Sequence, residues 1–439
     1  MEFGVCLFLL IIMLLISFLM EKSYYSPLNL FLSLWIIVSI FSKMQLYGMY
    51  NFSSKVYWIV LVGNIGYFLG YLFMRKVKKK NNYVKKERKY IFKEKTLKVL
   101  SYILFIFYLL IAVRVVLSMK NNGYSYSTMR TIYMHGTSDE QIKLIYGSYY
   151  FQLMELFIFK PLLFASISIS SVRFLKKMNI DSQIILSFLS LILFVIINFG
   201  RIILIQTLLC VFIGYKIIGN KIDKEIKKKI KKKFKKIIFP VLIIFFVGFV
   251  FLSNQRQADT HNSLTVGEQV YSYLAIPMPI MDYWINYVDN NNIQTYGMFY
   301  IKGLANIVDV FTSKLGISLP FFNTANELNN MTEVFLPIFP NHVYNAFVSI
   351  FYYFYVDWRF FGVFLGSFIY GLLMGKLYDN ALKYKDVYSL SILLLMYQGL
   401  LKCFVRWEFV QMSFWISIIW ILFLVKKVNG GDVFEEKGN

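Results

Sequence analysis

Uncharged apolar runs alternate with shorter polar or basic segments along most of the chain. Many of these runs approach the ~20 residues that a helix needs to cross the hydrocarbon core of a bilayer. The runs cover residues 3–20, 27–41, 56–74, 97–118, 153–172, 180–198, 202–218, 237–253, 360–374, 387–401 and 409–425. The pattern therefore predicts an all-α, polytopic integral membrane protein.

Composition agrees with this prediction. Of the 439 residues, 58% are hydrophobic and only 16% are charged. The first apolar run has neither a basic n-region nor a small-residue cleavage site, so we expect a retained helix rather than a signal peptide. The cysteines Cys6, Cys210 and Cys403 have neither metal-ligand spacing nor the pattern of a disulfide framework. We expect no metal site and no cofactor.

The formal net charge of +23 is concentrated in two lysine-rich segments, at 75–96 and 220–236. Both segments connect apolar runs, and short loops rich in Lys and Arg lie on the cytoplasmic side of membrane proteins. Their charge also suits anionic lipid head groups. We therefore expect contact with membrane lipids, and no nucleic-acid partner.

The lysine-rich segments orient the rest of the chain. We predict an N-terminal transmembrane bundle over 1–253, an extracytoplasmic loop over 254–358, and C-terminal helices with a short cytoplasmic tail over 359–439. Within the loop, the apolar stretches at 270–281 and 298–320 are expected to form helices lying on the surface.

Residues 341–356 decide the parity of the topology. If this stretch crossed the membrane, the lysines of the 376–385 loop and of the tail at 426–427 would lie outside, against the positive-inside rule. We therefore predict a re-entrant or surface segment here and about eleven crossings, with the N-terminus outside and the C-terminus inside.

This topology places several arginines on the outer side: Arg114, Arg130, Arg201, Arg256, Arg359 and Arg406. Guanidinium groups bind phosphate oxygens with a planar fork of donors and stay charged when partly buried. An anionic ligand is one explanation; pairing with Asp139, Glu155 or Glu408, or snorkelling at the interface, is the other. We favour a ligand for Arg201 and Arg256, whereas for Arg114 and Arg359 pairing or snorkelling explains the position at least as well as a ligand does.

Glu155 is an acid within an apolar run, where ionisable residues are costly and are usually paired or functional. We expect a structural ion pair. Lys160 lies five residues on, which is not a natural helical pairing distance, so Arg201 is an equally reasonable partner.

Two patches of sequence, NFGRIIL at 198–204 and NHVYN with YFYVD at 341–357, together resemble Wzy-type polysaccharide repeat-unit polymerases. The segment 198–204 (NFGRIIL) resembles their Gly/Ser-Arg-x-x-Leu helix start. The segments 341–345 (NHVYN) and 353–357 (YFYVD), followed by Phe361-Gly362, resemble their Thr-Asn-x-Tyr-Thr and Tyr-x-Asp-x-Gly region, and a long outer loop directly precedes both. The chain departs from the pattern at His342, which replaces a small or polar residue, and at the intervening Trp358-Arg359.

The resemblance implies a GT-C-like helical fold in the bacterial cytoplasmic membrane. Such enzymes act at the outer leaflet on undecaprenyl-pyrophosphate-linked oligosaccharides. They transfer the growing capsule- or O-antigen-type glycan to a hydroxyl of the incoming unit and need no nucleotide sugar. Expected partners are this lipid-linked substrate and the flippase and chain-length regulator of the same pathway.

The same chemistry gives roles to the candidate residues. Fixed cations stabilise the departing pyrophosphate, for which Arg201, Arg256 and Arg406 are the candidates. The acceptor hydroxyl needs a base or a positioning group, and either His342 or Asp357 could serve, with His261 as runner-up. Aromatic faces pack on sugars, and the predicted glycan-lining residues are Tyr344, Tyr353, Tyr355 and Trp358.

Three other activities remain open from the sequence. A ligase similar to the O-antigen ligases would share this whole architecture. A flippase for lipid-linked oligosaccharides should show two similar halves around a central cavity, and no internal repeat is visible. A secondary transporter is the non-enzymatic alternative, and the large outer loop and outward arginines count against it.

Overall fold

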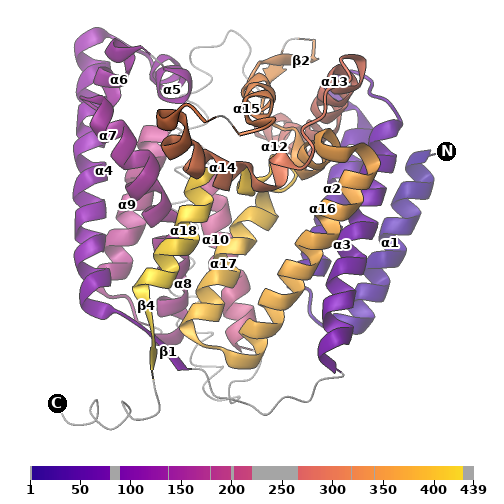
Figure 1. Cartoon of the computed structure of the whole chain (residues 1–439), viewed down its shortest axis with the longest axis horizontal. Helices are drawn as coiled ribbons and strands as arrows, with labels where there is room; N and C mark the ends of the chain where they lie inside the picture. Colours follow the sequence, from indigo (N-terminus) through magenta and orange to yellow (C-terminus); the bar gives the residue numbers. More distant parts are fainter. Residues whose placement is uncertain are drawn as a thin grey trace. The chain divides into compact units, whose positions relative to one another are not determined.

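The computed structural model describes residues 2–79, 89–136, 138–177, 179–198, 202–219, 265–317, 319–340 and 342–428. These residues are mostly helical (Figure 1). The chain forms two compact units, each assembled from separate stretches. Unit 1 comprises Met1–Lys85, Leu264–Lys383 and Met396–Trp415, and unit 2 comprises Lys86–Ser263, Tyr384–Leu395 and Ile416–Asn439.

Unit 1 contains three N-terminal helices, the helices of the long polar segment, and one long kinked helix. Its α-helices are α1 (Glu2–Glu21), α2 (Pro27–Met44), α3 (Lys55–Lys79), α12 (Val266–Ala275), α13 (Pro277–Asn290), α14 (Met298–Thr312), α15 (Phe322–Met331) and α16 (Ser349–Tyr384). Short 3₁₀ turns lie at η1 (Leu46–Gly48), η3 (Ser313–Leu315) and η4 (Glu408–Val410). Strands β2 (Leu336–Phe339) and β3 (His342–Tyr344) pair antiparallel, with Leu336 opposite Tyr344.

Unit 2 is built on two long helices and the helices that pack on them. It contains α4 (Glu94–Asn122), α5 (Tyr126–His135), α6 (Asp139–Ile145), α7 (Tyr149–Met154), one π-helical turn η2 (Glu155–Phe159), α8 (Lys160–Lys177), α9 (Ser182–Asn198) and α10 (Ile202–Gly219). Strands β1 (Lys89–Phe92) and β4 (Val425–Val428) pair antiparallel. The boundary between the units falls within α17 (Val387–Lys402) and α18 (Met412–Leu424).

The predicted apolar runs correspond to helices wherever the structure describes them. Six helices are long and apolar enough to cross a membrane: α1, α2, α3, α4, the continuous α7–η2–α8 stretch, and α16. Shorter apolar helices occur at Ser182–Asn198, Ile203–Ile217, Val387–Lys402 and Met412–Leu424. The run at 237–253 lies outside the described residues. An all-α membrane protein is thus supported, with two small β-ladders as additions.

The α16 helix is interrupted where the sequence predicts the end of a non-crossing segment. Trp358 (φ −148°, ψ 36°) and Arg359 (φ 55°, ψ −138°) leave helical geometry, so Ser349–Asp357 and the following residues form two separate helical halves. A Cβ at Gly362 would lie 2.2 Å from the Phe354 carbonyl oxygen, and one at Gly366 would lie 2.7 Å from the Phe354 ring. The first half therefore lies back against the second.

Glycines bring the second half of α16 against α3. A Cβ at Gly66 would lie 2.5 Å from the Phe364 carbonyl oxygen, and one at Gly70 would lie 2.0 Å from that of Phe368. From the other side, a Cβ at Gly371 would lie 2.2 Å from the Tyr67 oxygen. Small residues four apart allow such backbone contact between membrane helices.

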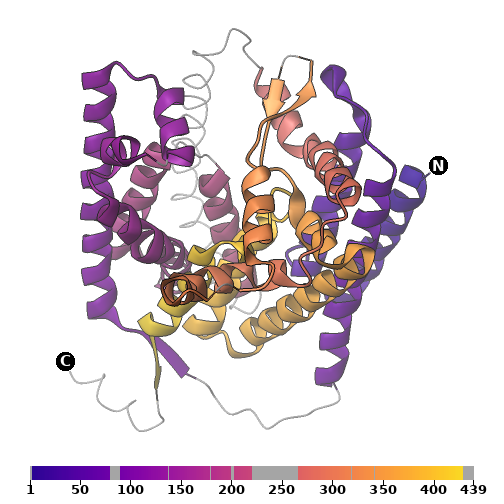
Figure 2. The same cartoon turned by 45° about the horizontal axis from the view of Figure 1, so that its top comes forward.

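The helices of the long polar segment gather at one end of unit 1 (Figures 1 and 2). They are more deeply packed than expected for helices lying on a surface. α12 and α13 pack on α2, and the α13 side chains from Pro277 to Asp282 are all buried. This occurs because α13 has an apolar face that α2 and α3 cover.

Candidate functional site

The connection between α2 and α3 organises this end of unit 1. Its first turn is held by the backbone N–H of Leu46, which donates to the Tyr271 hydroxyl at 2.8 Å. The Tyr50 N–H donates to the Ile338 carbonyl at 3.0 Å, which fixes the β2–β3 hairpin. The Ser53 N–H donates to Asp282 Oδ2 of α13 at 2.9 Å. One loop therefore joins the hairpin, α12 and α13.

An ionic cluster begins where this connection enters α3. The ammonium of Lys55 pairs with Asp289 at the end of α13. Arg359 Nε pairs with the other oxygen of Asp289 at 3.2 Å. The Tyr355 hydroxyl donates to the two Asp289 oxygens at 3.2 and 3.1 Å. We call these four residues the Asp289 cluster.

The Asp289 cluster carries more positive than negative charge and can be reached by solvent. The side chains of Lys55, Asp289 and Arg359 are 34%, 26% and 24% exposed. Both cations also lie over the Tyr355 ring, at 5.1 Å for the ammonium and 5.4 Å for the guanidinium. Arg359 Nη1 has no hydrogen-bond partner among the described residues. Nη1 is itself buried, so an anion that reached the cluster would have to bind the exposed parts of Lys55 and Arg359 in place of the Asp289 carboxylate.

Arg359 is held in a backbone conformation that side chains rarely adopt. Its φ of 55° and ψ of −138° fall in a region that favours glycine. Thr295 N–H donates to the Val356 carbonyl that the kink releases, at 3.3 Å, and Arg359 Nη2 donates to the Val288 carbonyl at 3.5 Å. Backbone strain of this kind is concentrated at functional sites. The kink thus sets the position of the Arg359 guanidinium.

Asp357, one of the two predicted bases, has a structural position. Its side chain is fully buried. Oδ1 accepts from the Thr295 hydroxyl at 2.5 Å and from the Phe299 N–H at 3.2 Å, at the start of α14. A carboxylate at a helix N-terminus satisfies N–H groups that have no partner within the helix. In this conformation Asp357 anchors α14 and does not face solvent.

Arg406 is the only predicted pyrophosphate ligand among the described residues, and it is paired. Its guanidinium forms an ion pair with Glu333, with a side-chain exposure of 16%. The Tyr353 hydroxyl lies 3.5 Å from Asn329 Oδ1, close enough to Arg406 for electrostatic interaction. Arg201 and Arg256, and the alternative base His261, lie outside the described residues.

The remaining predicted residues are distributed over two settings. His342 and Tyr344 lie on β3 and are half-buried, with the Tyr344 ring 5.7 Å from the Phe339 ring. Trp358 packs on Tyr300, with ring centroids 5.4 Å apart. The rings of Tyr353 and Tyr355 are buried in the core, so neither offers a face to a sugar in this conformation.

Sequence reasoning did not find Lys55 or Asp289. Lys55 lies at the start of an apolar run, a position typical of an interfacial lysine. Asp289 is one of many polar residues in its segment. They lie 234 residues apart in the chain. The only local signal was the Asp357-Trp358-Arg359 triplet, which interrupts an aromatic run.

In unit 2, Glu155 has hydroxyl partners. Tyr133 donates to Oε1 at 3.1 Å and Tyr146 donates to Oε2 at 3.3 Å. In the π-helical turn the Lys160 N–H donates to the Glu155 carbonyl. Residues five apart are therefore neighbours here, as they are not in an α-helix. Lys160 adds a favourable electrostatic interaction. The expected structural role is compatible with this geometry, with tyrosines as the hydrogen-bonding partners.

Among the described residues, no group of His, Cys, Asp and Glu could hold a metal ion. Comparison with protein-family models, with curated proteins and with solved structures finds no match for this chain.

Proposed function

We propose that the protein is a membrane glycosyltransferase that polymerises undecaprenyl-pyrophosphate-linked repeat units at the outer face of the bacterial cytoplasmic membrane. The proposal joins the sequence resemblance to one structural observation: two partly exposed cations, Lys55 and Arg359, share a single carboxylate at a strained kink. Guanidinium and ammonium groups are the side chains that bind phosphate oxygens in proteins. Arg359 therefore joins Arg201, Arg256 and Arg406 as a candidate ligand.

The proposed reaction balances without a further reactant. The bond between the anomeric carbon of the donor glycan and the pyrophosphate oxygen breaks, and a bond forms from that carbon to the acceptor hydroxyl oxygen. The acceptor proton passes to a base, and undecaprenyl pyrophosphate leaves with the bonding electrons. Cations near the departing oxygen stabilise its growing charge more in the transition state than in the ground state.

His342 is the better candidate base of the two predicted from sequence. It is half-buried on β3, whereas Asp357 is fully buried and engaged with α14. A neutral imidazole accepts a proton near physiological pH.

The proposal is tested by deleting the gene and sizing the surface glycan on a gel. We expect single capped repeat units in place of a ladder. A normal ladder would exclude the polymerase. Polymer that stays on its lipid carrier would indicate a ligase, and repeat units trapped at the cytoplasmic leaflet would indicate a flippase.

Complementation with Arg359→Lys then tests the site. Lysine keeps the charge for Asp289 but loses the guanidinium fork, and loss of a transition-state donor of this kind costs on the order of 100-fold in rate. We therefore expect a strongly shortened ladder at equal protein level. Arg114→Lys is the matched control, because Arg114 donates to the Lys143 carbonyl at 2.8 and 2.6 Å in unit 2. Equal ladders from both variants would remove Arg359 from the site.

A further inference from the structure

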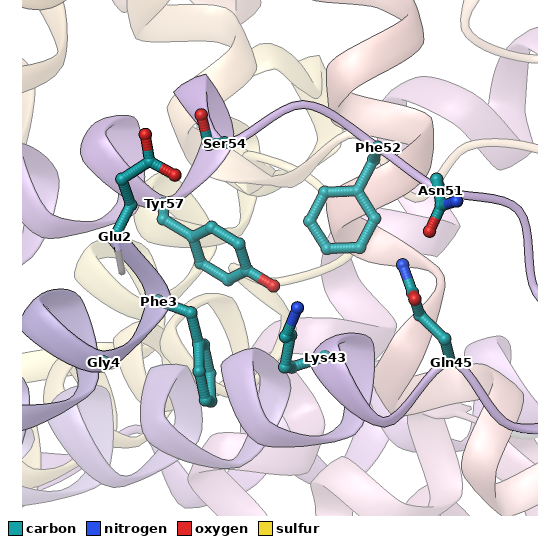
Figure 3. Close-up of a pocket in the computed structure, with 9 residues that line it drawn as sticks. All are labelled: Glu2, Phe3, Gly4, Lys43, Gln45, Asn51, Phe52, Ser54 and Tyr57. Atoms are coloured by element: carbon teal, nitrogen blue, oxygen red, sulfur yellow. The ribbon is translucent and has the colours of Figure 1, made fainter.

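A separate cavity of about 350 Å³ opens beside the α2–α3 connection, within unit 1 (Figure 3). It lies between the start of α1, the end of α2 and the start of α3. The lining residues are Glu2, Phe3, Gly4, Lys43, Gln45, Asn51, Phe52, Ser54 and Tyr57. Cavities that bind small molecules begin at about 300 Å³, so this one can hold a ligand the size of a sugar or two.

Three polar side chains of this cavity have no partner in the part of the chain that the structure describes. Lys43, Gln45 and Asn51 make no side-chain hydrogen bond or ion pair with any residue that the structure describes. Their neighbours behave differently: Ser53 bonds to Asp282, and Lys55 pairs with Asp289. Ser53 bonds to the buried Asp282, whereas Lys43 and Asn51 are exposed and Gln45 is half-buried, so the polar groups of the cavity are open to a ligand.

The geometry places these groups around aromatic rings. In Figure 3, the Lys43 ammonium and the Tyr57 hydroxyl point toward one another, and the Gln45 and Asn51 amides face each other beside the Phe52 ring. The Phe52 and Tyr57 rings are 5.5 Å apart at 48°. Amides provide both donors and acceptors, and aromatic faces pack on C–H surfaces. This combination matches a sugar, which presents hydroxyls at its edge and C–H groups on its faces.

We infer that this cavity is a carbohydrate subsite that binds a sugar residue of the substrate glycan. That the sugar belongs to the substrate rests on the proposed function; the affinity for carbohydrate does not. Its lining has one acid, Glu2, and one base, Lys43, so it lacks the excess positive charge that an anion would need. Ser54 lines the subsite, and the next residue in the chain, Lys55, belongs to the Asp289 cluster. The two sites are therefore neighbours along the α2–α3 connection.

Saturation-transfer NMR on the full-length protein tests the inference. The protein is placed in lipid nanodiscs free of glycoside detergents, and the probe is the host surface glycan cleaved to oligosaccharides by mild acid. We expect saturation transfer from the wild-type protein to the oligosaccharides, and about tenfold weaker binding by Asn51→Ala, which removes an amide, and by Phe52→Leu, which removes a ring. Tyr50→Ala is the matched control, since Tyr50 lies on the same connection, is 48% exposed and does not line the cavity.

Two results would overturn the inference: no saturation transfer from the wild-type protein to the oligosaccharides, or equal binding of the oligosaccharides by all three variants. Equal binding would be the outcome if a zwitterionic lipid head group occupied the cavity and sugars bound elsewhere. The test is separate from the proposed function. If gene deletion leaves the glycan ladder normal while Asn51→Ala still weakens binding, the carbohydrate subsite is supported and the polymerase function is excluded. A lost ladder together with unchanged binding by Asn51→Ala would remove the subsite and leave the polymerase.

Discussion

Two buried charged groups, Asp357 against the start of α14 and Lys302 within α14, have opposite effects on the stability of this helix. Asp357 belongs to a segment that resembles a catalytic region, yet its carboxylate accepts hydrogen bonds from Thr295 and from Phe299 at the start of α14. Lys302 looked like one of a few basic residues in a polar loop, yet it is only 4% exposed. In both cases a residue type was visible in the sequence, and its burial depended on contacts with segments far along the chain.

Replacing Asp357 separates a structural from a catalytic role. Asp357→Asn keeps the oxygen that accepts from Thr295 and Phe299, so we expect a near-normal glycan ladder. Asp357→Ala leaves these donors without a partner and should destabilise the protein by about 1–3 kcal/mol, measured as reduced thermal stability of the purified protein. A catalytic base would lose activity in both variants, so loss of the ladder in Asp357→Asn at normal stability would contradict the structural role.

Lys302 should make stability depend on pH. Burial lowers the pKa of this ammonium from 10.5 to about 8, and no ion pair to another described residue offsets the cost. Between these values the unfolded chain holds a proton that the folded protein has released, so stability rises with pH from about 8 toward 10.5. At neutral pH the buried charge costs roughly 3 kcal/mol.

We therefore expect Lys302→Met to melt at a higher temperature than the wild type at pH 7, and the difference to shrink as the pH approaches 10. Melting of the purified protein across this range provides the measurement. The exposed Lys98 gives the control variant, Lys98→Met, in which the difference from wild type should be small at every pH. A constant difference for Lys302→Met would show that the ammonium is not buried in the folded protein.

At the scale of elements, the sequence predicted where helices lie better than how they meet. Apolar runs located the helices because membrane crossing imposes length and composition. The short length of 341–356 and the charge parity indicated a segment that does not cross, and the kink at Trp358-Arg359 is compatible with that prediction. The glycines at 66, 70, 371 and 375 were equally visible, but only the fold shows that those of α3 lie against the backbone of α16 and those of α16 against the backbone of α3.

This glycine contact gives a prediction for stability. In Gly70→Val the new Cβ would lie 2.0 Å from the Phe368 carbonyl oxygen, so α3 and α16 must separate. We expect little folded protein in a detergent-solubilised fraction measured by size-exclusion chromatography. Gly267→Ala is the control, because its Cβ would meet only the Thr265 side chain at 3.9 Å. Normal yield of Gly70→Val would show that the two helices are not in backbone contact.

For the whole molecule, the division into two units was not predicted. The sequence was divided at 253 and 358 by polarity, whereas each compact unit combines stretches from both sides of those boundaries. Linear composition cannot show this, because α12 and α13 pack on the N-terminal helices of unit 1 through contacts between residues more than two hundred positions apart. The same separation explains why the ion pairs of Asp289 with Lys55 and with Arg359 could not be predicted from the sequence.

We propose that this chain joins lipid-linked repeat units. The most direct test is reconstitution of the purified protein in liposomes with undecaprenyl-pyrophosphate-linked repeat units, without nucleotide sugars and with a metal chelator. Mass spectrometry of the glycan should show products that grow by one repeat unit, with one undecaprenyl pyrophosphate released for each bond formed. Repeat units that stay at their original length, in liposomes that hold folded protein, would contradict the proposed polymerase activity.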